Sequence, residues 1–240
     1  MVLLPGKSIM HSMMNRRTLN RRITLLTLLL MLVAVAQAQD GSAQKITESA
    51  VWKIPATFLA GAHKACDSGP ASEFNICFIT QMTKAGAGDD AVNFTRTLFQ
   101  GNGGDVGILT GFHAVGPVDI GWVTYPLRAN TNYGLLLLNG KPRIVEAEDL
   151  KHLDHRGLEQ SAQFQDLKEQ FPKVDVWPGD RDGKTWPTAQ NDSDGELQFT
   201  IGYPLINGCH ACAHEGTAIF NWNFDAKGKF KGTQFIGMTQ

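Results

Sequence analysis

The sequence predicts an α+β protein, in which N-terminal helices pack on one face of an antiparallel sheet that ends in a C-terminal β meander. Between residues 55 and 101 the apolar residues recur with helical spacing. From residue 118 onward they mostly alternate with polar residues in short segments bounded by Gly, Asn and Pro. Helices followed by strands, without a regular βαβ alternation, are typical of α+β domains. Because no internal repeat or linker interrupts the pattern, residues 39–240 are expected to form a single domain.

Residues 1–38 have the features of a signal peptide. Residues 1–22 contain five basic and no acidic side chains, and an uncharged, Leu-rich run occupies residues 23–36. Ala36-Gln37-Ala38 then supplies the small-x-small pattern of a cleavage site. The apolar run has 14 residues, whereas a membrane-spanning helix needs about 20. The mature chain is therefore expected to be periplasmic or secreted, with no membrane span.

The leader leaves two questions open. Translation could start at Met1, Met13 or Met14, because each precedes the basic and apolar segments. The pair Arg16-Arg17 is compatible with twin-arginine export, whereas the Leu-rich run is more typical of the general secretory route.

The charge balance argues against nucleic acid as a partner. The whole chain has 22 basic and 23 acidic residues, and removal of the leader leaves 17 basic and 23 acidic residues, a net charge of −6. Phosphate binding requires a basic stripe, which this chain lacks. No cofactor-binding motif occurs either, because the glycine-rich segment at residues 101–104 lacks both the P-loop lysine and the dinucleotide spacing.

Helices are predicted at residues 55–66, 72–85 and 89–100 and again at 148–171, where Pro172 ends the pattern. In each segment, apolar side chains recur on one face: Phe58, Ala62 and Cys66; Phe74, Cys77, Phe78 and Met82; Val92, Leu98 and Phe99; and Phe164, Leu167 and Phe171. Glu148, His152, His155 and Glu159 would form a polar stripe on the last helix, which we interpret as a solvated, ion-paired face rather than a metal site.

Strands are predicted where apolar residues alternate or run together between turn residues. Asn139-Gly140 is a strong hairpin signal, and residues 177–195 are expected to form a polar loop. The expected strands are residues 118–125, 133–138, 143–146, 197–206, 217–224 and 230–238.

The four cysteines are expected to form two disulfides, because the chain is predicted to reach an oxidising compartment. Cys66 ends one predicted helix and Cys77 lies early in the next, so a bridge would lock a helical hairpin. Cys209 and Cys212 are close enough to bridge across a corner between two strands. We favour this pairing over the two crossed ones.

The segment around Cys209, His210, Cys212 and His214 holds the densest cluster of reactive residues. It does not match a covalent haem site, because Ala213 stands where the histidine should follow the second cysteine. Thiol–disulfide exchange would use the Cys-x-x-Cys spacing, although such centres normally begin a helix and here a strand follows. Zinc or copper(I) binding would use the two thiolates and two imidazoles. We favour a disulfide-pinned loop over both alternatives.

The sequence favours a non-enzymatic binding or inhibitor-like protein, because no nucleophile can be paired with a base and no catalytic constellation gains a second confirming residue. The expected binding residues are His210 and His214 on the pinned loop, and Trp177 and Trp186 in the loop before the meander. The expected partner is another exported protein, and the oligomeric state is left open.

Residues 197–238 resemble periplasmic lysozyme inhibitors of the Ivy type. The resemblance rests on Cys209-His210-Ala211-Cys212 between two antiparallel strands, followed by a strand that contains Trp222. In that family the disulfide-closed loop enters the active cleft of lysozyme, so the resemblance implies that role for His210. The loop here is two residues shorter between its cysteines, and the pair Cys66 and Cys77 is additional.

We expect the exported protein to begin at Gln39 and to contain no free thiol. N-terminal sequencing and intact mass, with and without alkylation under denaturing conditions, measure both properties. Two or more free thiols in freshly isolated protein would contradict the structural disulfides and favour the metal or redox alternative.

Overall fold

The computed structural model describes residues 44–67, 69–101, 104–129, 132–179 and 186–239, and the predicted leader, residues 1–38, lies outside this part of the chain. The helical elements in chain order are η1 (Glu48–Ala50), α2 (Phe58–Cys66), α3 (Ala71–Lys84), α4 (Asp89–Gly101), η2 (Leu150–His152), α5 (His155–Glu159) and α6 (Ala162–Gln170). The strands are β1 (Ile108–His113), β2 (Asp119–Thr124), β3 (Tyr133–Leu138), β4 (Ile144–Glu146), β5 (Val174–Val176), β6 (Thr188–Asn191), β7 (Leu197–Asn207), β8 (His214–Phe224) and β9 (Phe230–Thr239).

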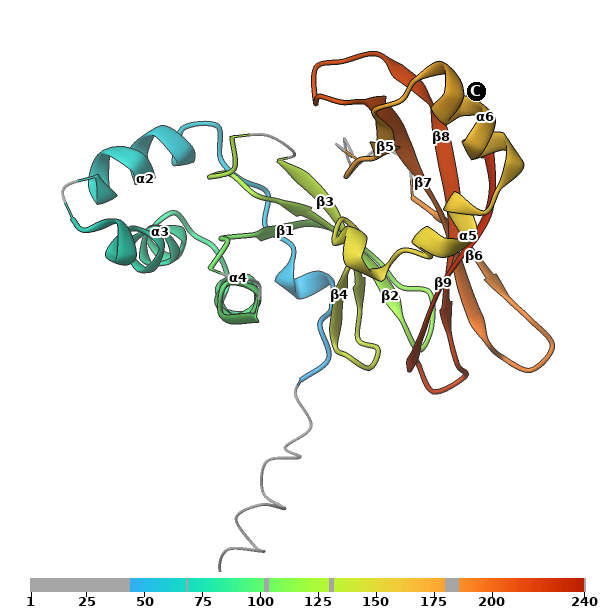
Figure 1. The fold of residues 1–240 in the computed structure, drawn as a ribbon. Helices are drawn as coiled ribbons and strands as arrows, with labels where there is room; N and C mark the ends of the chain where they lie inside the picture. Colours follow the sequence, from blue (N-terminus) through green and yellow to red (C-terminus); the bar gives the residue numbers. More distant parts are fainter. Residues whose placement is uncertain (1–43, 68, 102–103, 130–131, 180–185, 240) are drawn as a thin grey trace, which may run out of the picture. The chain divides into compact units, whose positions relative to one another are not determined.

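The α+β class is confirmed, but the strands form two antiparallel sheets rather than one (Figure 1). The first sheet has the order β1-β2-β3-β4, and the second has the order β5-β7-β8-β9 with β6 also paired to β7. The predicted hairpin at Asn139 is present, and Asn139 takes a left-handed φ of 67°. Strands β1, β5 and β6 were not predicted, because each is short or lacks a clear apolar alternation.

The N-terminal helices cover one face of the first sheet. Phe94 and Leu98 of α4 pack with Leu109, Val123 and Leu136, which point to that side of β1, β2 and β3. Helices α2 and α3 pack on each other and reach the sheet through Val106 and Ile108. This arrangement confirms the predicted packing of helices on one face.

The other face of the first sheet packs against the second sheet. Ile120 and Trp122 of β2 and Leu135 and Leu137 of β3 lie in one buried cluster with the inward side chains of β7 and β8. These inward residues alternate strictly along both strands, as expected for a sheet with one buried face. They are Leu197, Phe199, Ile201, Tyr203 and Leu205 on β7, and Ala218, Phe220, Trp222 and Phe224 on β8.

The prediction of a single helix over residues 148–171 is wrong, because three side-chain caps each begin a separate, shorter helical segment. Asp149 accepts a hydrogen bond from the backbone of Lys151, Asp154 from Gly157 and Ser161 from Phe164. Such caps favour new helix starts over continuation. The result is η2, α5 and α6 in succession.

The polar stripe predicted on that helix is therefore not formed. Glu148 lies outside these helices, where it is buried and accepts a hydrogen bond from the backbone of Gly179 at 2.9 Å. His155 lies one element away from His152, and its Nε2 is 2.8 Å from the carbonyl oxygen of Leu150.

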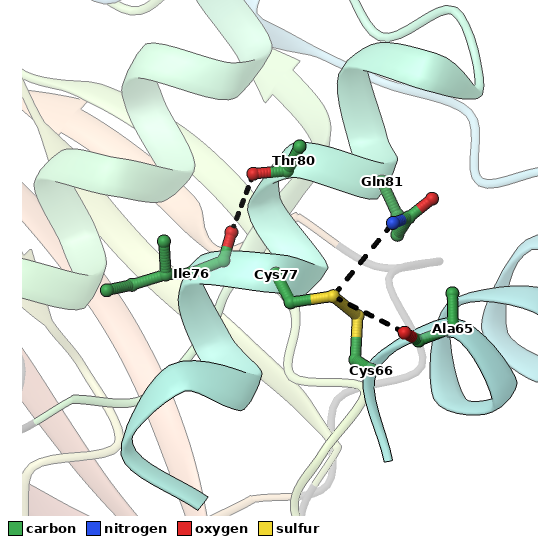
Figure 2. The surroundings of a disulfide bond; sticks show 6 residues. All are labelled: Ala65, Cys66, Ile76, Cys77, Thr80 and Gln81. Carbon is green, nitrogen blue, oxygen red and sulfur yellow. Dashed lines mark hydrogen bonds between the residues drawn. A yellow bond between two sulfur atoms is a disulfide. The ribbon is translucent and has the colours of Figure 1, made fainter. Parts of the chain in front are cut away.

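The first disulfide is present as predicted and joins Cys66, the last residue of α2, to Cys77 in α3 (Figure 2). Figure 2 also shows Gln81, one turn further along α3, donating to the Cys77 sulfur. Cys66 is buried, whereas Ile76 beside the bridge is 61% exposed. The bridge therefore links two helices that also pack through the buried rings of Phe58 and Phe78.

A buried carboxylate ties the start of the described chain to the first sheet. Asp119 is fully buried and accepts hydrogen bonds from Asn139 at 2.7 Å and from the backbone of Val115 at 3.0 Å, and it pairs with Lys45 at 3.0 Å. The amide of Asn139 in turn bonds both backbone groups of Ile46. One carboxylate thus organises three segments that are distant in the sequence.

Burial alone would raise the pKa of Asp119, but the hydrogen bonds from Asn139 and Val115 and the charge of Lys45 outweigh it and lower the pKa. A carboxyl group whose pKa is lower in the folded than in the unfolded state stabilises the fold above the unfolded pKa of about 4. That contribution is lost as the pH falls through the folded pKa.

We expect Asp119→Ala to lower the free energy of unfolding at pH 7 by about 2–4 kcal/mol, because it leaves several buried donors without an acceptor. Lys45→Ala should cost less than about 1 kcal/mol, since Lys45 is largely exposed. Urea titrations at pH 7 and pH 3 measure both effects. Wild-type protein and Asp119→Ala that lose equal stability between the two pH values would contradict this role.

Candidate functional site

The turn between β7 and β8 is exposed and closed by the second predicted disulfide, Cys209–Cys212. The backbone N–H of Cys212 donates to the carbonyl of Cys209 at 2.8 Å, which forms a turn inside the bridge. Gly208 enters this turn with a φ of +89°, a conformation that glycine adopts without a steric penalty. The chain between the two strands is therefore fixed both covalently and by hydrogen bonding.

His210 projects from this turn and contacts Trp177, which comes from the loop before the meander; we call the surface formed by the turn, His214 and Trp177 the corner. The two rings are 6.1 Å apart in an edge-to-face arrangement, with His210 exposed and Trp177 partly buried. Strand β5 positions the tryptophan, because the backbone N–H of Trp177 donates to Pro204 at 3.0 Å and extends the β5–β7 ladder. An aromatic pair beside a fixed turn presents an apolar surface with a polar edge.

His214 belongs to the same corner, and its side chain approaches Thr217 of the same strand. It begins β8 opposite Ile206, and its Nε2 is 3.4 Å from the hydroxyl of Thr217. His210 and His214 therefore border the exposed turn from its tip and its base.

The structure places Trp186 against the first sheet. Its ring is 5.3 Å from Trp122 and 5.5 Å from His113, and it packs on the central core as a partly buried residue. A side chain at Gly111 would approach the Trp186 ring, so this glycine makes room for the packing. Of the four predicted binding residues, three therefore gather at the corner and Trp186 packs elsewhere.

The oxidation state of the cysteines limits which reactions and ligands they can support. All four are bridged, so metal binding at Cys209 and Cys212 would first require reduction of the bridge. Within the described ranges, no three His, Cys, Asp or Glu side chains gather as a metal site would require. Cys209 lies in a turn between strands, so it lacks the helix N-terminus that lowers the thiol pKa in thiol–disulfide centres.

A polar surface that the sequence analysis missed lies on the outward side of the second sheet. Gln198 donates from Nε2 to Oδ1 of Asn223, and Thr200 donates from Oγ1 to Oδ1 of Asn221, both at 2.8 Å. Each pair is directly opposed in the β7–β8 register. The alternation of polar residues along these segments indicated a solvated face, but only the register shows that the side chains meet.

A cavity of about 340 Å³ lies between α4, β4 and η2. Four of its charged lining residues are engaged in ion pairs: Asp149 pairs with Lys151 and His152, and Glu146 pairs with Arg128. This internal pairing makes the cavity a poorer candidate site than the exposed corner.

Among the described residues, no helix combines the length and the apolar character needed to cross a membrane. Comparison of the chain with family models, with curated proteins and with solved structures finds no match. The site is therefore interpreted from its own geometry.

The two disulfides should differ in their contribution to stability. Loop entropy gives about 3 kcal/mol for the 12-residue loop of Cys66–Cys77 and about 2 kcal/mol for the four-residue loop of Cys209–Cys212. We expect Cys66→Ser/Cys77→Ser to lower the free energy of unfolding more than Cys209→Ser/Cys212→Ser does. Denaturant titration of both double variants measures this order, and the reverse order would show that the β7–β8 bridge is the main staple.

Proposed function

We propose that this protein is an exported, non-enzymatic binding or inhibitor-like protein that recognises another exported protein through the β7–β8 turn. The observation that carries the proposal is the exposed His210 on a disulfide-closed turn, in edge-to-face contact with Trp177. The two disulfides fit an oxidising compartment, and the periplasm is the location that we propose.

A fixed turn favours binding because less conformational entropy is lost on contact. A flexible loop loses about 1–2 kcal/mol per residue when its backbone is ordered, whereas this turn is constrained before any partner arrives. Trp177 adds a large apolar surface next to the imidazole of His210, and tryptophan is among the residues most often found at the energetic centre of interfaces.

The resemblance to Ivy-type inhibitors supplies a defined partner for the first test. If the resemblance extends to function, His210 enters the active cleft of a lysozyme. Hen egg-white lysozyme is therefore a suitable probe, because its hydrolysis of cell walls gives a direct readout of inhibition.

Thiol–disulfide exchange at Cys209–Cys212 is the second candidate, because both residues are exposed to solvent. The reduction potential of this pair separates the two proposals. A structural bridge should lie below about −300 mV, and a catalytic one well above that value.

We expect His210→Ala to weaken binding of the partner about tenfold or more, as is typical for a residue at the centre of an interface. The melting temperature should change by less than about 2 °C, since the side chain is exposed. His63→Ala is the matched control, because it removes an exposed histidine from α2. Inhibition of lysozyme and quantitative capture from a periplasmic extract measure the effect.

Equal binding by His210→Ala and wild-type protein would overturn the role of the turn. A markedly lower melting temperature for His210→Ala would show that the side chain supports the fold instead. Wild-type protein that leaves lysozyme fully active would end the inhibitor interpretation drawn from the resemblance.

A further inference from the structure

The outward side of the second sheet carries neutral polar side chains in register. The inward residues Phe199, Ile201, Phe220 and Trp222 are all buried, so the side chains that alternate with them point away from the core. Of these outward side chains, five form what we term the amide face. They are Gln198 and Thr200 on β7, Asn221 and Asn223 on β8, and Gln234 on β9.

Cross-strand hydrogen bonds order this face before any ligand binds. Asn221 and Asn223 accept from Thr200 and Gln198 through their Oδ1 atoms. Their Nδ2 groups have no acceptor among the side chains that the structure describes, so they remain available to a ligand. Gln234 of β9, the strand on the other edge of β8 from β7, pairs with Asn221 and is exposed.

The five residues of the amide face are uncharged, and the nearest exposed charges on the flanking strands are Asp175 of β5 and Lys231 of β9. Between Gln198 and Pro204, and between Thr217 and Asn223, every outward residue of β7 and β8 is neutral. Phosphate-bearing ligands and anionic membranes require basic groups, which these segments do not supply. Amides and hydroxyls both donate and accept hydrogen bonds, which is the pattern that a ligand rich in hydroxyl groups requires.

Trp177 stands on the same side of the sheet, at one end of these rows. It lies opposite Pro204 through its backbone hydrogen bond, and its strand neighbour Val176 points into the core. From Pro204 to Thr200 the β7 strand rises about 13 Å. A partly exposed aromatic ring therefore lies on the same side of the sheet as the amides, several residues away, with Gly202 and Ile219 between them.

We infer that this outward face binds a neutral glycan chain, with a sugar ring stacked on Trp177 and sugar hydroxyls bonded to Asn221, Asn223 and Gln234. An aromatic ring suits the apolar C–H side of a pyranose, and ordered amides suit its hydroxyls. The inference goes beyond the proposed function, since its polar contacts lie away from the β7–β8 turn.

Native affinity electrophoresis tests the inference. The probes are gels containing dextran, soluble starch or mixed-linkage β-glucan, with polygalacturonate as the acidic comparison. Wild-type protein should be retarded by at least one neutral polysaccharide, and Asn221→Ala/Asn223→Ala should weaken that binding about tenfold, since two ordered hydrogen-bonding amides are lost. Trp177→Ala should weaken it as well.

The matched control is Gln163→Ala/Gln170→Ala, which removes two exposed amides from α6 and should leave retardation unchanged. Gln234→Ala gives a second test on an exposed edge-strand residue if the double asparagine variant does not fold. The amide-face variants should retain partner binding through the turn, so this inference and the proposed function can fail separately.

Three results would overturn the inference. They are wild-type protein that no neutral polysaccharide retards, retardation by polygalacturonate alone, and equal weakening by the α6 control and the amide-face variants.

Discussion

The contact between the inward face of the β7–β8 hairpin and the first sheet is the interaction on which the rest of the structure depends. Each of these strands has 11 residues, and their alternate side chains enter the same buried cluster as Ile120 and Leu137. Tyr203 adds a buried hydrogen bond of 2.7 Å to the carbonyl of Ala147, which ties β7 to the segment after β4. Because successive side chains of a strand point to opposite faces, burial of one set determines which side chains point outward.

The candidate recognition surfaces follow from that constraint. The hairpin turn extends past the core, so Cys209, His210 and Cys212 reach solvent, and the bridge limits the conformations that the turn can take. The outward amides lie on the back of the same strands, where core packing on the other side holds the backbone in place. A rigid scaffold under an exposed site reduces the ordering cost of binding, so fold stability and recognition both depend on one hairpin.

Local features were predictable from the sequence, and features that depend on distant pairing were not. Both disulfides join cysteines close in sequence, and Asn139 adopts the left-handed turn that its neighbour Gly140 suggested. The division of the strands into two sheets depends on non-local pairing, and the break of residues 148–171 depends on caps at Asp154 and Ser161 that compete with helical periodicity. At the site, the sequence indicated a disulfide-closed loop that carries His210. The contact of His210 with Trp177, the packing of Trp186 and the pairing of Asn221 with Thr200 depend on residues distant in the sequence and could be found only from the structure.

The central claim is that the turn and the outward face are preformed on the hairpin, and native-state hydrogen exchange tests it most directly. The backbone amides of β7 and β8 should exchange only through global unfolding and rank among the slowest in the protein. They should remain among the slowest in Cys209→Ser/Cys212→Ser, because core packing rather than the bridge holds the strands. Exchange of these amides through local opening in the wild-type protein would contradict the account, as would their local loss of protection when the bridge is removed.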